Sequence, residues 1–181
     1  PLVLRIALPS MLAQFVSVLY SIVDRIYIGN IPQTGTLALA GAGVCGPAVT
    51  LVSAFAFWIG TGGAPIMSIR LGQRDEASAE RIMSSCFSLL LIFSAILMLV
   101  LLPLREPLLR LFGASSLTLP YAVPYFTLYL LGTPFALLAG GMNQLVICQG
   151  FARAGMQSVL LGALLNLLLD PIFIFSLGMG V

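Results

Sequence analysis

The sequence predicts an all-α integral membrane protein with five transmembrane helices. The chain has 181 residues, of which 60% are hydrophobic and 8% are charged, and its mean hydropathy is +1.10. Soluble domains carry about a quarter charged residues, so this composition does not suit a fold surrounded by water. The apolar runs are continuous rather than alternating, which excludes the strands of a β-barrel. The lipid bilayer is therefore the expected surroundings of the chain, as for a multi-pass protein of the cell (inner) membrane.

Five apolar segments are long enough to cross a bilayer. A hydrocarbon core of about 30 Å needs about 20 residues of helix, and the segments that meet this length are 6–28, 44–69, 82–104, 120–147 and 157–177. We treat residues 1–181 as one lobe, because no soluble domain or linker fits between these spans. Transporter lobes built from repeats usually hold an even number of helices, so a sixth helix is expected to follow.

The arginines predict how the lobe is oriented. Cytoplasmic loops carry an excess of basic residues. Five of the eight arginines fall on the side of the N-terminus, which predicts a cytoplasmic N-terminus; they are Arg5, Arg70, Arg74, Arg81 and Arg153.

The connections between the spans have their own patterns. Residues 70–81 predict a tight charged hairpin, in which Gly72 suits a helix end and Asp75 suits the start of the next helix. Residues 105–112, followed by Gly113, predict a short interfacial helix on the outer face. Residues 41–46 match the dinucleotide pattern GxGxxG, but a membrane span follows and no acid lies in the required place. We interpret them as a loop and the close-packed start of a helix.

The composition excludes most catalytic chemistry. Histidine is absent and all eight basic residues are arginine, so there is no Ser-His or Cys-His pair and no lysine for a Schiff base. The three cysteines lack CxxC spacing, which argues against a zinc site and a disulfide framework. A net charge of +2 is too small to suggest nucleic acid. We expect no enzyme, no catalytic residue and no cofactor.

Two acidic residues lie within the spans. Four of the six acids fall in connections, which leaves Asp24 in the first span and Asp170 in the fifth. A charged aspartate at a helix centre costs about 2.5–3.5 kcal/mol on the insertion scale. Such residues usually face a cavity or the bundle interior, and they are candidates for function.

Polar side chains continue along one face of each of these spans. Steps of three or four residues keep a set on one helical face. The first span has such a set ending at Asp24, with Tyr20 beside it, and the fifth has one ending at Asp170. The first set is Ser10, Gln14, Ser17, Ser21 and Asp24; the second is Ser158, Gly162, Asn166 and Asp170. We expect the serines and Gly162 to serve close helix packing.

The geometry favours one shared site. The first and fifth spans run in the same direction, so Asp24 and Asp170 both lie in the outer half of the membrane. Two carboxylates in one low-dielectric pocket cannot both stay charged without a proton or a cation. Asn166, one turn before Asp170, offers an amide oxygen. The sequence predicts an ion-coupling site at Asp24, Asn166 and Asp170, which would hold H⁺ or, with the same three residues as metal ligands, Na⁺.

The residues resemble a known family. Four parts of the chain carry the resemblance: Pro9 followed by Asp24, the segment 37–43, the segment 60–72, and residues 166–175 with the ending 178–180. In that order they resemble the N-terminal half of a multidrug and toxic compound extrusion (MATE) transporter of the DinF-like branch. The resemblance implies twelve helices in two halves, so that the partners of this chain are a sixth helix and a C-terminal half.

The resemblance also implies an antiporter that exports amphipathic, often cationic drugs or toxic compounds by alternating access, driven by H⁺ or Na⁺. Asp24, Asn166 and Asp170 would be its ion site. Tyr20, Tyr125 and Asn143 would lie beside that site or line the cavity, and Gln14 lies on the same face of the first span.

Two other functions remain open from the residues. A lipid-linked oligosaccharide flippase of a related branch would favour an arginine-rich cavity, whereas the spans hold almost no arginine beyond Arg25. An intramembrane aspartyl protease could use two buried carboxylates that share a proton. Neither aspartate lies in the Tyr-Asp or Gly-x-Gly-Asp setting expected of such a protease.

Overall fold

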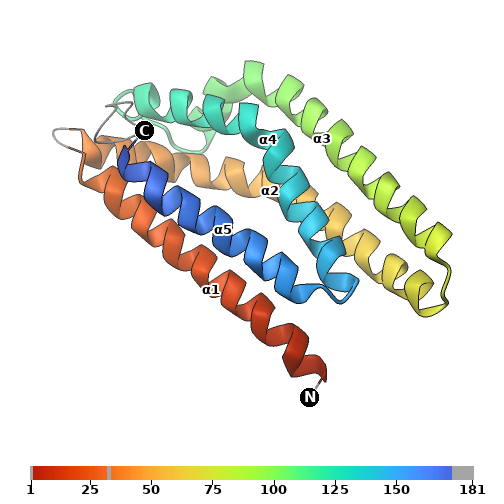
Figure 1. Cartoon of the computed structure of the whole chain (residues 1–181). Coiled ribbons are helices and arrows are strands. Elements are labelled where there is room, and N and C mark those ends of the chain that lie inside the picture. Colours follow the sequence, from red (N-terminus) through yellow and green to blue (C-terminus); the bar gives the residue numbers. More distant parts are fainter. Residues whose placement is uncertain (1, 32–33, 173–181) are drawn as a thin grey trace. The chain divides into compact units, whose positions relative to one another are not determined.

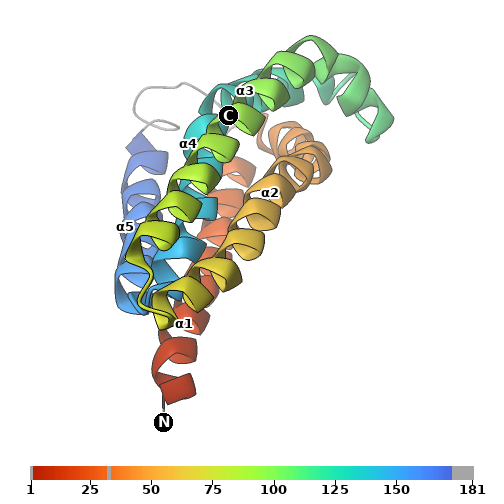
Figure 2. The same ribbon diagram turned by 90° about the vertical axis from the view of Figure 1, so that its right-hand side faces the viewer.

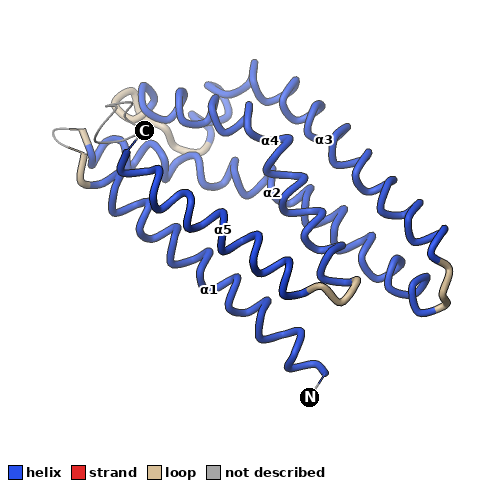
Figure 3. The backbone as a smooth tube through the Cα atoms, in the orientation of Figure 1, coloured by secondary structure: helices blue, strands red, loops and turns tan. Residues whose placement is uncertain are grey.

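The computed structural model describes residues 2–31 and 34–172, with side chains from Ala7 onward. Its elements are five α-helices (Figures 1 and 3), with no strand in the described ranges. They are α1 (Leu2–Gly29), α2 (Gly35–Gly72), α3 (Glu76–Leu111), α4 (Leu119–Cys148) and α5 (Ala152–Pro171). All five are long and apolar enough to cross a membrane. The predicted fold class is confirmed, and residues 173–181, which include the predicted end of the fifth span and residues 178–180, lie outside the described residues.

The predicted start of the second span at residue 44 is wrong because packing decides it. Residues 41–46 are helix throughout rather than partly loop, since α2 begins at Gly35. The first turns of α2 pack on the start of α4: a side chain on Gly41 would meet the Ala122 backbone nitrogen at 3.1 Å, and the Cys45 thiol donates to the Ala122 carbonyl at 3.5 Å. This contact favours helix where the glycines alone suggest a loop.

The predicted interfacial helix at 105–112 is not a separate element. α3 continues without interruption to Leu111, although Pro103 and Pro107 remove two backbone donors. Unsatisfied backbone groups are costly in an apolar environment, so the chain keeps its remaining helical bonds through this stretch. The helix ends where Gly113 takes a φ of 98°, as expected for a left-handed position.

The α2–α3 hairpin forms a Schellman-type turn. The Arg74 amide donates to the Leu71 carbonyl and the Asp75 amide to the Arg70 carbonyl, both at 3.0 Å. α2 ends at Gly72 as predicted, and the left-handed residue of the turn is Arg74, with a φ of 60°. Asp75 then caps α3 by accepting the Ser78 amide at 3.1 Å. Hydrogen bonds from the Ser78 side chain and backbone lower the pKa of Asp75. In Figure 2 this hairpin joins the lower ends of α2 and α3.

The chain divides into two compact units. Unit 1 holds residues 1–47, 105–127 and 156–181, and unit 2 holds residues 48–104 and 128–155. In unit 2, glycines let α2, α3 and α4 approach closely. A side chain on Gly63 would collide with the Cys86 sulfur, and one on Gly141 would meet Leu90 at 2.7 Å. Leu90 is completely buried, so unit 2 has a tightly packed helical core.

Candidate functional site

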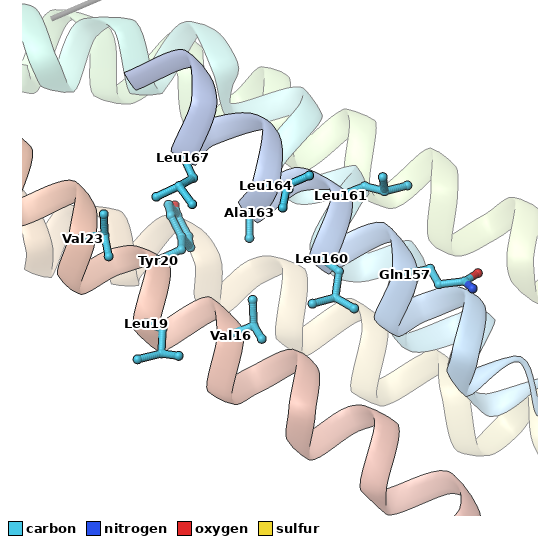
Figure 4. A pocket seen from close by; sticks show the side chains of 10 residues that line it. All are labelled: Val16, Leu19, Tyr20, Val23, Gln157, Leu160, Leu161, Ala163, Leu164 and Leu167. Atoms are coloured by element: carbon cyan, nitrogen blue, oxygen red, sulfur yellow. The ribbon is translucent and has the colours of Figure 1, made fainter. Parts of the chain in front are cut away.

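Residues of α1 and α5 line a cavity in unit 1 (Figure 4). Its volume is about 630 Å³. In Figure 4, Val16 and Tyr20 of α1 point toward Leu160, Ala163 and Leu167 of α5. Of the ten lining residues, only Tyr20 and Gln157 carry a polar side-chain group, and none is charged. The cavity is therefore an apolar slot with two polar groups, a lining suited to an amphipathic ligand.

The predicted polar stripe of α1 does not form the wall of this cavity. The residues of α1 in the wall are Val16, Leu19, Tyr20 and Val23, and three of them lie one residue before a member of the predicted stripe at 17, 21 and 24. One residue corresponds to a rotation of about 100° around a helix. The Ser21 hydroxyl instead donates to the Ser17 carbonyl of the same helix at 2.9 Å. This serine satisfies its hydrogen bond within α1, which agrees with a structural role.

The two aspartates lie just beyond one end of the cavity. Asp24 follows Val23 on α1, and Asp170 lies one turn after Leu167 on α5. The two helices run in the same direction (Figure 1), so both acids are at the same end. Both are half-buried, and the charge of Asp24 acts on the Asp170 carboxylate. The two acids that the sequence singled out thus lie at the same end of α1 and α5.

Arg25 is the basic residue next to this pair. It is exposed, and its charge acts on Asp24. In the described part of the chain, no ion pair within 4 Å involves Arg25, Asp24 or Asp170. The carboxylates therefore keep their oxygens available for another positive group.

Asn166 and Gln14 do not line the cavity. Both are exposed, on α5 and α1 respectively. Asn166 lies one turn before Asp170 on the same helix, so its amide is near that acid along the chain. None of the three predicted ligands lines this cavity, and the shared low-dielectric pocket at Asp24 and Asp170, with Asn166 nearby, stays a prediction.

The other two predicted cavity residues belong to different units. Tyr125 is a half-buried residue of α4 in unit 1. Asn143 belongs to unit 2, where its side-chain oxygen lies 2.7 Å from the place that a side chain on Gly155 would take. Along α4 the two are separated by about 27 Å at 1.5 Å per residue. Gln157 was not among the predicted residues, and its polar side chain within the predicted span 157–177 is the signal that could have found it.

The site offers carboxylate oxygens rather than a transition-metal ligand set. Across residues 7–31 and 34–172 no group of three histidine, cysteine or acidic side chains gathers. Carboxylate and amide oxygens are hard ligands of the kind that simple cations take. The pair Asp24 and Asp170, with Asn166 nearby, could bind a proton or an alkali cation.

Five helices that are long and apolar enough to cross a membrane define a multi-pass membrane protein, and the sequence comparisons give its family. The MatE family model matches residues 9–172. The chain belongs to the MatE family of membrane transporters, which are not enzymes. Its place is the cell membrane, as for its bacterial relatives.

Individual relatives support this assignment. The chain is 27% identical over 178 residues to the multidrug export protein MepA of Staphylococcus haemolyticus, covering 98% of this chain and 39% of that protein. It is 28% identical over 175 residues to an FAD transporter of Shewanella oneidensis, covering 97% and 38%. The chain therefore spans about 40% of the length of the curated relatives it matches.

Solved structures agree with the sequence relatives. The outward-facing conformation of a multidrug resistance MATE family transporter of the MOP superfamily superposes with a TM-score of 0.91. The sequence identity is 28%, and the match covers 99% of this chain and 39% of that one. The five helices of this chain thus have the backbone path of a MATE transporter lobe.

Proposed function

We propose that this chain supplies the ion-coupling lobe of an antiporter that exports amphipathic, often cationic compounds by alternating access. The observation that carries the proposal is the pair Asp24 and Asp170, two intramembrane acids at the same end of two parallel helices and within reach of each other's charge. An intramembrane acid is costly unless it works with a partner. The pair would bind H⁺ or Na⁺, and Asn166 would add an amide oxygen.

The cavity supports an amphipathic substrate. Its leucine and valine walls suit an apolar body, while the Tyr20 hydroxyl and the Gln157 amide can orient a polar group. The acids at the end of the slot favour a positive charge there. An incoming cation or proton would neutralise the acids and so change the attraction of the site for a cationic substrate. This reciprocal effect is the physical basis of exchange.

The flippase and the protease receive less support. An arginine-rich cavity is expected for the flippase, yet no arginine lines the cavity between α1 and α5. A protease function disagrees with the membership of this chain in a transporter family.

The test is efflux of a lipophilic cationic dye from cells that express this protein and lack their own drug exporters. Asp170→Asn should abolish efflux while expression stays intact, because an amide cannot exchange a proton or neutralise a cation. Glu106→Gln, which changes an exposed acid of α3, is the matched control and should leave efflux unchanged. Full activity of Asp170→Asn would contradict the proposal.

The coupling ion is tested separately. The protein is reconstituted in vesicles, and the Na⁺ gradient and the pH gradient are varied one at a time. The proposal expects one of the two gradients to drive dye transport, and that dependence should vanish in Asp24→Asn. Transport that ignores both gradients would argue against ion exchange.

A further inference from the structure

A second groove lies in unit 2, between α2 and α3, far along the chain from the aspartates. Its volume is about 500 Å³. Its walls are apolar and include Trp58 and Phe93, whose ring centroids lie 5.8 Å apart in an edge-to-face arrangement. The floor includes Gly62 and Gly63, and one cation, Arg81, lies in the wall. The groove thus combines a long apolar surface with a single positive charge.

The two neighbouring glycines explain why the groove exists. A side chain on Gly63 would collide with the Cys86 sulfur, so this glycine holds α2 close to α3. A side chain on Gly62 would meet nothing within 4 Å. The helices therefore touch on one side of the glycine pair and leave open space on the other. That space is the groove, and a larger residue at position 62 would fill it without disturbing the helix contact.

The groove has the length of one lipid chain. Arg81 lies in the second turn of α3, next to the hairpin, and Phe93 lies about 18 Å further along the helix at 1.5 Å per residue. Half of a bilayer core is about 15 Å. The groove therefore runs from the membrane surface at the hairpin end through one leaflet. Trp58 remains 64% exposed in its wall, so an occupant would cover a large aromatic surface.

The mouth of the groove carries both signs of charge. A second hollow of about 670 Å³ shares Arg81 and Ser85 with the groove and adds Glu80 to its lining. Neither Glu80 nor Arg81 forms an ion pair within 4 Å in the described part of the chain. Residues 70–81 hold three arginines and three acids, so the hairpin itself carries no net charge that would favour an anionic lipid.

We propose that this groove binds one membrane phospholipid with a phosphoethanolamine headgroup. An acyl chain lies along Gly62 against Trp58 and Phe93, the phosphate pairs with Arg81, and the ammonium group pairs with Glu80. Guanidinium suits phosphate because its donors match the phosphate oxygens, and a primary ammonium can donate hydrogen bonds to a carboxylate. A phosphocholine headgroup has no N–H donor and would satisfy Arg81 alone.

Trp58 provides the measurement, because it is the chain's one tryptophan. The protein is reconstituted in phosphocholine vesicles, and a phosphoethanolamine lipid with brominated acyl chains is added in increasing proportion. Bromine quenches tryptophan fluorescence on contact. A bound lipid predicts quenching that saturates at a low fraction of brominated lipid. The brominated phosphocholine lipid should quench only in proportion to its amount.

Variants test each part of the site. Gly62→Leu should remove the saturable quenching, whereas Gly43→Leu, a change at another open position of α2, should keep it. Arg81→Gln should weaken the saturable binding about fivefold, which corresponds to one basic contact, and Arg74→Gln outside the groove should not. Glu80→Gln should abolish the preference for phosphoethanolamine over phosphocholine.

Two results would overturn the proposal. One is quenching that follows the amount of brominated lipid equally for both headgroups and is unchanged by Arg81→Gln and Glu80→Gln. The other is absence of any saturable component in the unaltered protein, which would mean that another protein segment covers Trp58 or that bulk lipid alone contacts it. The two charge variants keep the test valid should Gly62→Leu fail to fold.

Discussion

Helices α1 and α5 differ from α2 and α4 in how much of their length they bury. In the most apolar stretch of each span, 11% of the residues are buried for α1 and α5, against 28% for α2 and α4. The two sparsely buried helices carry the intramembrane aspartates and the 630 Å³ cavity. The well-buried ones carry the glycine contacts of unit 2.

The difference indicates a division of labour within the lobe. A tightly packed core does not deform continuously: it stays rigid or switches between two arrangements. The packed helices α2, α3 and α4 therefore suit the role of a scaffold in unit 2. A helix pair with an open slot between its members can change its contacts at lower cost when an ion or a substrate binds. Stability should therefore depend on the glycine-packed core, and transport on α1 and α5.

The largest effect is expected in the core of unit 2. Leu90→Ala should destabilise the protein by about 2–5 kcal/mol, because Leu90 is fully buried against Gly141 and its removal leaves a cavity. Leu165→Ala on α5 removes the same atoms from a side chain that is 56% exposed, and should change stability by about 0.5 kcal/mol or less. Thermal unfolding in detergent measures both. Equal losses would break the comparison between the two helix groups.

The sequence predicted the helices well because hydrophobic length is a local property. It misplaced the start of α2 because that start depends on a contact between Gly41 and Ala122, which are distant in sequence. The same limit applies to the candidate site. Asp24 and Asp170 were found from sequence since charge is rare in these spans, whereas a leucine facing the cavity has no feature that distinguishes it from one facing lipid.

A smaller effect is expected at the hairpin. Arg74 is the one non-glycine residue with a positive φ in the described ranges, and a left-handed conformation costs a residue with a Cβ about 1–2 kcal/mol. Arg74→Gly should therefore stabilise the protein by about 1 kcal/mol, after the entropy of glycine is counted. Gly150→Ala, at the equivalent position after α4 with a φ of 91°, should destabilise it. A melting temperature that moves in the same direction for both variants would contradict this account.

The smallest effect concerns the charge of Asp75. Hydrogen bonds from Ser78 hold the pKa of Asp75 below its ordinary value of 3.8 in the folded protein. The charged form thus stabilises the folded state fully above pH 3.8, and this contribution is lost as the pH falls through the lower folded pKa. Asp75→Asn keeps an N-cap acceptor but removes the titration, so its melting temperature should fall less steeply than that of the unaltered protein below about pH 4. Asp75→Ala lacks the cap and should be less stable throughout the pH range. If the melting temperatures of the unaltered protein and Asp75→Asn fall in parallel as the pH is lowered, the cap acts through its shape alone. The stability of the hairpin, like that of the core of unit 2, would then depend on packing rather than on charge.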